Sequence, residues 1–403
     1  MSFQQGLSGL NAASKSLDVI GNNVANANTV GFKQSRAEFA DVYANALNGS
    51  GTGSAGIGVK VADIQRQFTQ GNITNTENPL DIAINGNGFF RLSNSGAITY
   101  SRNGQFQLDK AGYIVTSSGE RLTGYVADSN GALQTGALTD IQINSADLAP
   151  KASTKVSNVL NLDLRKPVIT AAFNANDPST YSQVVPISVY DSQGNPHTIQ
   201  SYLIKSAANT WTVRTTVDGT TDVTPTPVPQ LTFDTNGRLT GASSHSITLP
   251  TPIVPAAMPI TVDFATSTQF GNDYSLNSQV QDGYASGRLS SFSTASDGTI
   301  IGRYTNGQAK ALAQVVLAKF ANPNGLAALG NNQFAETSDA GVPVIGKAGT
   351  GGLGVLQSSA TEDSNVDLTA ELVNMITAQR YYQANAQTIK TQDQVLQTLV
   401  NLR

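Results

Sequence analysis

The 403-residue chain contains no cysteine and carries little charge. The absence of cysteine excludes disulfides, thiolate-bound metals, iron–sulfur clusters and thiol catalysis. Charged residues make up 13% of the chain, against about 25% in a typical soluble protein. The net charge is −4, so no basic excess is available to bind a phosphate backbone, and we expect no nucleic-acid binding. A surface with so little charge repels its own copies weakly, which favours self-association.

Long apolar runs are also missing. No stretch of about 18 apolar residues occurs, so we expect no membrane insertion. The first residues, Met1 to Leu7, have neither a basic nor an apolar segment and do not resemble a cleaved signal peptide. We therefore expect a protein that stays in the cytosol or leaves by a route that needs no cleaved signal.

Motifs that carry chemistry are few. Two Gly-x-Gly-x-x-Gly patterns occur, at 51–56 and 349–354, but neither lies between a predicted strand and a predicted helix, so we expect no nucleotide cofactor. The segment 341–347 approaches a phosphate-binding loop but is not followed by the hydroxyl residue that ligates magnesium. The two histidines, His197 and His245, fit no metal-ligand spacing and are interpreted as solvated loop residues. We expect no enzyme, with no catalytic residue, metal or cofactor.

An apolar heptad pattern predicts a helix at the N-terminus. One set of positions repeats every seven residues, and a second, mostly small set follows it three residues later. The first set is Phe3, Leu10, Leu17 and Val24, and the second is Gly6, Ala13, Ile20 and Ala27. The pattern fits a coiled-coil seam, and an amphipathic helix packed on its own domain is the alternative on periodicity alone.

The C-terminus carries a longer pattern of the same kind. From Asp367 to Arg403 there is neither glycine nor proline, and we predict a single helix with a capping box at 364–367. Its seam residues are Leu368, Met375, Tyr382, Ile389 and Leu396. Two heptad helices at opposite ends of one chain are expected to pair, and a helix about 55 Å long is expected to pack against neighbouring copies as well.

Between the two helices the pattern favours strands. A short helix is expected at 39–47 and a flexible Gly/Ser tract at 48–56. From residue 72, apolar and polar residues alternate between hairpin turns such as 85–86 and 118–119. We predict an α+β, mainly β fold with a terminal helical coiled-coil pair and two nested β domains. The predicted parts are a terminal helical domain (1–30 with 364–403), a connecting segment (31–71), an inner β domain (72–149 with 285–363) and an inserted outer β domain (150–284).

Both ends of the chain resemble one protein family. The stretch from Leu7 to Lys33, which contains Ile20-Gly-Asn-Asn-Val-Ala-Asn26, resembles the N-terminal signature of the bacterial flagellar rod and hook proteins. Residues 364–390 resemble the matching C-terminal signature. Residues 87–106 are similar to the first β domain of the family, and 189–198 to the outer domain of its hook members, which distal rod proteins lack.

The resemblance implies a structural subunit of the flagellar hook, outside the cell, without a cofactor. Such subunits form a curved tubular polymer that passes torque from rod to filament as a universal joint. The partners it implies are further copies of the chain, the distal rod protein, the hook–filament junction proteins, the hook cap scaffold protein, the hook-length control protein and the flagellar type III export apparatus. It also implies that the helix seams, and Asn26, Gly31, Phe32 and Lys33 of the connecting segment, contact neighbouring subunits.

Two alternatives stay open at this point. One is the distal rod protein of the same family, and the other is a secreted β protein that binds or cleaves glycans.

Overall fold

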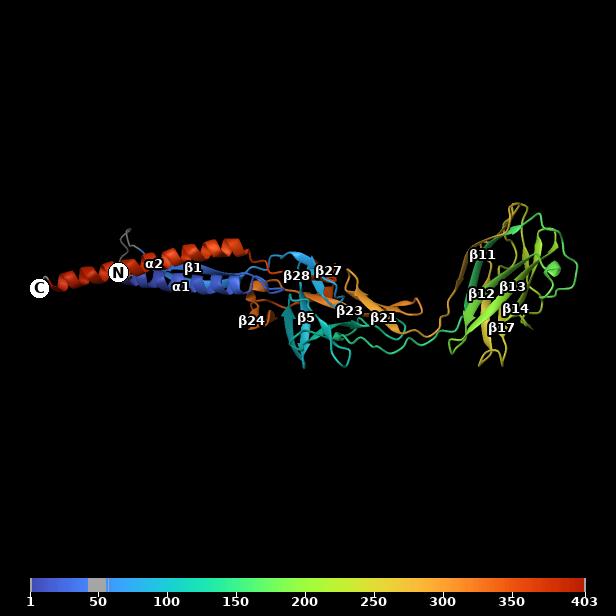
Figure 1. The fold of residues 1–403 in the computed structure, drawn as a ribbon, viewed down its shortest axis with the longest axis horizontal. Coiled ribbons are helices and arrows are strands. Elements are labelled where there is room, and N and C mark those ends of the chain that lie inside the picture. The colour runs from blue at the N-terminus through green and yellow to red at the C-terminus, as the bar shows by residue number, and fades with distance from the viewer. Residues whose placement is uncertain (1, 43–55, 57, 402–403) are drawn as a thin grey trace. The chain divides into compact units, whose positions relative to one another are not determined.

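The computed structural model describes residues 2–42, 56 and 58–401. The chain divides into two units. Unit 1 comprises Met1–Asn144, Ser291–Arg303 and Ala309–Arg403, and unit 2 comprises Ser145–Ser290 and Tyr304–Gln308. The described chain has a long helix near each end and is otherwise mainly strand (Figure 1), which confirms the predicted fold class.

The two helices of unit 1 lie side by side and antiparallel. They are α1 (Ser2–Ala25) and α2 (Leu368–Asn401), and Figure 1 shows them in contact along α1. Gly6 of α1 faces Ile389, whereas Gly9, one turn further on, faces Asn385. Of the described helices, none has the length and apolarity that a membrane crossing requires.

Helix α2 begins with a cap that differs from the predicted one. The Asp367 carboxylate accepts the backbone N–H groups of Thr369 and Ala370 at 2.9 and 3.1 Å. Asp367 is therefore the capping residue. Ser364, which the predicted capping box placed in this role, accepts the N–H of Val366 instead, so that prediction was wrong by three residues.

The connecting segment forms a two-stranded ribbon along α1. Strand β1 (Ser35–Val42) pairs antiparallel with β2 (Gly58–Arg66), and both strands contact α1. The short helix predicted at 39–47 is wrong for 39–42, which lie in β1, because pairing with β2 supplies the backbone partners that a short isolated helix would lack. Residues 43–47 and, except for Gly56, the Gly/Ser tract at 48–56 lie outside the described residues.

The main sheet of unit 1 is built around β23 (Ala309–Lys319), in which residues 313–318 are all buried. Among the described residues this sheet has 12 strands. Its main path runs β21 (Leu289–Thr294), β22 (Thr299–Tyr304), β23, β9 (Arg121–Val126), β5 (Phe89–Asn94), β6 (Ala97–Ser101), β25 (Gln333–Ala335) and β24 (Ala327–Gly330).

The other strands of this sheet are β7 (Gln107–Leu108), β8 (Ile114–Val115), β10 (Thr139–Asp140) and β26 (Val344–Lys347). Two short pairings bring distant parts of the chain together: β4 (Ile82–Asn85) with β27 (Val355–Ser358), and β3 (Ile73–Asn75) with β28 (Ala360–Glu362). Consequently the segment before α2 returns to the segment that follows the ribbon.

One of the predicted hairpin turns does not close a hairpin. At Asn85-Gly86 the chain changes sheets, because β4 pairs with β27 whereas β5 pairs with β6 and β9. The turn at Ser118-Gly119 does join paired neighbours, β8 and β9. A glycine turn alone therefore did not identify which strands pair.

Unit 2 contains two five-stranded sheets around one apolar core that includes Trp211 and Phe264. One sheet has the order β17 (Ser244–Leu249), β18 (Met258–Asp263), β11 (Lys155–Asp163) and β19 (Thr268–Phe270), with β20 (Ser275–Gln281) also on β11. The other has the order β12 (Gln183–Tyr190), β13 (Pro196–Ala207), β14 (Thr210–Val217) and β15 (Thr221–Asp222), with β16 (Gln230–Thr232) also on β14.

Neither histidine is a solvated loop residue, so that interpretation was wrong. His197 lies in β13, where Nδ1 is 3.0 Å from Asp218 and Nε2 is 3.7 Å from Asp191. His245 lies in β17 with its ring stacked on Phe264, and burial lowers the pKa of His245 to about 4.

Candidate functional site

Small residues of α1 allow the two helices to approach closely. Gly6, Ala13 and Ile20, which belong to the second heptad set, are buried. A Cβ atom at Gly6 would lie 3.1 Å from Cγ1 of Ile389, and one at Gly9 would lie 2.7 Å from Oδ1 of Asn385. The distance between helix axes depends on the side chains at the contact, and these glycines leave room for Ile389 and Asn385 of α2.

The predicted seam residues fall into two groups. One group is half-buried, and it consists of Leu10, Leu17, Val24, Met375 and Ile389. The other group is exposed by 39–49%, and it consists of Phe3, Leu368, Tyr382 and Leu396. Of the first group, Ile389 faces Gly6 of the other helix, whereas the second group is directed to solvent.

Further apolar side chains extend this exposed surface. On α2, Leu372, Val373, Ile376 and Tyr381 are exposed by 44–64%, and Leu7 on α1 is exposed by 44%. An apolar surface of this kind on a soluble protein marks an interaction site. The helix pair therefore has, besides the contact between its two helices, a set of exposed apolar side chains that the described chain leaves uncovered; we call this set the outer helix face.

A buried ion cluster joins the two ends of the chain to the main sheet. Lys33 Nζ lies 2.7 Å from Glu362 Oε1, and both side chains are completely buried. Arg102 Nε lies 3.8 Å from the other Glu362 oxygen. Lys33 also donates to the carbonyl of Thr69 at 2.7 Å. Burial lowers the pKa of Lys33, and the neighbouring Glu362 carboxylate opposes that shift.

The turn before Lys33 requires glycine. Gly31 has φ +71°, and a Cβ there would lie 2.7 Å from the backbone nitrogen of Asn103. Its N–H donates to the carbonyl of Glu362 at 2.7 Å. Phe32 is half-buried, and Asn26 bonds back to the carbonyl of Asn22 at 2.9 Å. The structure thus brings Gly31 and Lys33 to the ion cluster, while Asn26 and Phe32 stabilise the turn that leads there.

A second polar network lies between the helix pair and the ribbon. Asn23 donates to Glu371 at 3.1 Å and to the carbonyl of Ser35 at 2.8 Å, and it accepts the Ser35 N–H at 2.9 Å. Gln34 donates to the other Glu371 oxygen at 2.8 Å. Asn23 and Glu371 are both nearly completely buried.

Sequence reasoning missed Glu362, Arg102 and Glu371. The sequence signal for a buried role of Glu371 was weak, because an acidic residue in the first turn of a helix is usually exposed to solvent and interacts with the helix dipole. Among the described residues, no group of three His, Cys, Asp or Glu side chains could hold a metal ion. The helix pair and the buried polar clusters that join it to the sheet and to the ribbon are therefore features of packing and stability.

Four family models match the chain in order. They are described as flagella basal body rod protein (residues 3–33), flagellar hook protein FlgE/F/G D1 domain (83–158), flagellar basal body protein FlaE D2 domain (161–284) and flagellar basal body rod FlgEFG protein C-terminal (357–402).

Curated relatives match over their full length. The chain is 44% identical to the flagellar hook protein FlgE of Escherichia coli K12 and 45% identical to that of Salmonella typhimurium, each over 100% of both chains. It is 34% identical to that of Borreliella burgdorferi, over 100% of this chain and 99% of the other. Among solved structures, Helicobacter pylori FlgE2 aligns with a TM-score of 0.55 and 15% identity over 72% of this chain and 100% of that one, which is a likeness of fold.

Proposed function

Because the chain belongs to the flagellar hook protein family and is a structural subunit of the flagellar hook, we propose that its copies polymerise into a curved helical tube that passes torque from rod to filament as a universal joint. The full-length similarity to hook proteins does not favour the distal rod protein. It gives no support to a glycan-active protein. We propose a structural role without enzymatic activity.

The outer helix face is the observation that carries this proposal. Ile376 and Val373 are more than half exposed at the start of α2, and Leu396 is 49% exposed near its end, so exposed apolar side chains occur along the length of the helix. A second copy that covers it through a different surface makes a head-to-tail contact. Head-to-tail contacts that do not close into a ring generate a helical polymer. Dense packing of such helices is stiff, which suits the transmission of torque.

The β parts suit a joint that bends. With 13% charged residues in the whole chain, few ion pairs are available to lock neighbouring β domains together. We propose that the inner β domain (72–149 with 285–363) and the outer one (150–284) make weak, wet contacts with their neighbours that slide as one side of the tube shortens. The terminal domain (1–30 with 364–403) and the connecting segment (31–71) carry the tight contacts.

We infer the route of export and the partners by analogy with the family. The hook lies in the flagellum, and we propose that this chain arrives there through the flagellar type III export apparatus without a cleaved signal peptide. The proposed partners are the distal rod protein at one end of the tube, the hook–filament junction proteins at the other, and the cap scaffold and length-control proteins during growth.

Electron microscopy tests the proposal. The chain is expressed in a strain that lacks its own hook protein, and a variant that ends at Asp367 serves as control. Curved tubes of uniform width are expected from the full chain and none from the control. Soluble, folded full-length chain without tubes would contradict the proposal.

A further inference from the structure

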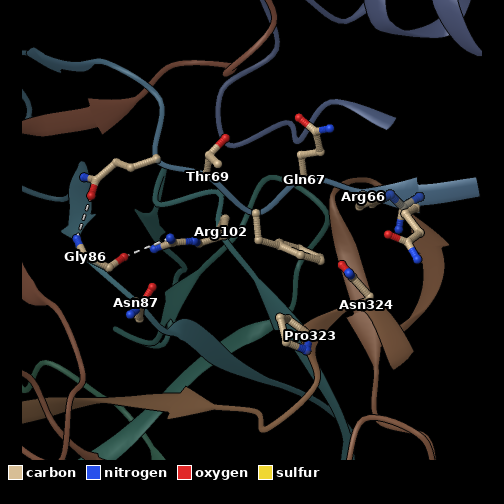
Figure 2. A pocket seen from close by; sticks show the side chains of 11 residues that line it. Arg66, Gln67, Thr69, Gly86, Asn87, Arg102, Pro323 and Asn324 are labelled. Atoms are coloured by element: carbon tan, nitrogen blue, oxygen red, sulfur yellow. Dashed lines mark hydrogen bonds between the residues drawn. The ribbon is translucent and has the colours of Figure 1, made fainter. Parts of the chain in front are cut away.

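A groove beside the connecting segment is lined by basic and aromatic side chains. Its volume is about 560 Å³, and its walls include Arg66, Phe68, Arg102 and Pro323 (Figure 2). Adjoining hollows extend it past Phe89, Lys319 and Phe320 in one direction and past Asp63 and Leu326 in the other. The groove thus combines an aromatic floor with basic edges.

Arg66 is the principal free cation of this groove. Its guanidinium lies 5.0 Å from the centre of the Phe334 ring, which fixes its position, and the residue is only half exposed. Within the described residues it has neither an ion pair nor a side-chain hydrogen bond, and the same holds for Lys319. The Arg66 guanidinium is therefore available to pair with an occupant that carries carboxylates. One carboxylate, Asp63, lies on the rim.

The other strand of the ribbon carries a complementary surface. The register of β1 against β2 shifts between Glu38 and Phe39, where Ala62 of β2 has no partner, and both Glu38 and Phe39 are exposed. Asp41, two residues after Phe39, lies on the same side of the strand as Phe39, and all three residues are exposed, Phe39 by 43%. Among the described residues neither Glu38 nor Asp41 has an ion-pair partner. The surface is therefore an exposed ring between two free carboxylates.

This acid-flanked ring cannot reach the groove of its own chain. Arg66 is opposite Ser35 in the ribbon, and Phe39 lies four residues further along β1, which is about 13 Å. The two surfaces are complementary in charge and in aromatic character, but they are separated along one rigid ribbon. Any pairing between these two surfaces is therefore between two copies of the chain.

We propose that Glu38, Phe39 and Asp41 of one copy dock in the groove at Arg66 of a neighbouring copy. The ring packs against Phe68 and Pro323, and the carboxylates pair with Arg66 and Lys319. Two different surfaces of one chain then meet head to tail, the kind of contact that yields an open helical polymer. The inference rests on the proposed polymerisation and names a contact within it.

Cysteine cross-linking tests the docking directly. The chain has no cysteine, so only introduced thiols react. Asn324 lies exposed on the rim of the groove. Purified hooks of Phe39→Cys/Asn324→Cys are expected to give, after oxidation, a ladder of dimers and larger species that a reductant removes, whereas each single variant gives none. Hooks of normal appearance without a ladder would overturn the docking.

A charge exchange gives a second measurement if the double-cysteine chain forms no hooks. Arg66→Glu is expected to reduce hooks per cell at least tenfold, and adding Glu38→Lys and Asp41→Lys is expected to restore them. Arg36→Glu is the matched control, since Arg36 is an exposed base of the same ribbon that does not line the groove. If Arg66→Glu assembles as well as Arg36→Glu, the docking is wrong although the hook function stands. If the unchanged chain forms no hooks, the proposed function itself fails.

Discussion

Lys33 and Glu362 are 329 positions apart in the sequence, and their completely buried side chains lie 2.7 Å from each other. Lys33 follows the turn after α1, and Glu362 ends β28, shortly before α2. The ion pair therefore ties together both segments that connect the helix pair to the sheet. Arg102, 3% exposed, contributes a second positive charge from the sheet side.

Replacement of Glu362 by alanine should destabilise the isolated subunit strongly. It leaves Lys33 and Arg102 buried without a counter-charge, and the loss of one partner of a buried pair costs about 3–5 kcal/mol. Denaturant unfolding of the purified subunit measures the free energy of unfolding. Lys15→Ala is the control, because Lys15 pairs with Asp18 at the surface, where a loss below about 1 kcal/mol is expected. Equal effects of the two changes would show that the buried pair contributes little.

A larger side chain at Gly9 should separate the helices and prevent hook assembly. The valine side chain of Gly9→Val would occupy space that the Asn385 side chain now fills, because a Cβ atom at position 9 would lie 2.7 Å from Oδ1 of Asn385. Gly21→Ala is the matched control in the same helix, since nothing lies within 4 Å of that position, and alanine is a better helix former by about 1 kcal/mol. Micrographs of cells should show hooks with Gly21→Ala and none with Gly9→Val. Normal hooks with Gly9→Val would show that close packing of the pair is dispensable.

A charge on the outer helix face should block polymerisation but not folding. Ile376 is 52% exposed, so Ile376→Asp should change the free energy of unfolding of the isolated subunit by no more than about 0.5 kcal/mol. In the polymer the same carboxylate would be buried without a partner. This costs on the order of several kcal/mol, and the cost repeats in every copy. The measurements are the unfolding curve and tube formation by the same purified protein. Tubes of normal length would exclude Ile376 from the interface.

The stability of unit 2 should fall as the pH drops below about 6.5. The pKa of His245 is lowered by burial to about 4 in the fold, whereas the unfolded chain has the ordinary value of about 6.5. Between these values the unfolded state binds a proton that the folded state does not, so stability is lost as pH falls, by about 2 kcal/mol at pH 5. His245→Gln should remove this part of the slope. An equal decrease in the free energy of unfolding of both proteins between pH 7 and pH 5 would contradict this prediction.

The outer β domain should be dispensable for making a tube. The two ends of the excision are already paired, because Lys151 and Tyr284 form an antiparallel bridge. A short Gly/Ser bridge between these positions should therefore leave the remaining chain unstrained. We expect the shortened subunit to polymerise into tubes that are straighter or variable in curvature, with poorer motility. A folded shortened subunit that forms no tubes would place this domain in the assembly core, and unchanged curvature would show that it does not set the shape.

The terminal helices were predictable because their signal is local. Seven-residue apolar spacing and the absence of glycine and proline from 367 to 403 specify a long helix without reference to the rest of the chain. The strand at 35–42 was not predictable in this way. Its backbone partners lie in β2, so the pairing, and not the local composition, decides its structure.

By itself the sequence determined that the chain lacks disulfides, carries little charge, is mainly β and ends in two heptad helices of a recognisable family. Only the tertiary structure decided which apolar residues of the two helices are half-buried and which remain exposed. Periodicity defines the apolar side of a helix, but the close approach of the partner helix is at the small residues Gly6 and Gly9. The buried pair of Lys33 and Glu362 is likewise a tertiary property, since neither residue has a local feature that indicates a partner 329 positions away.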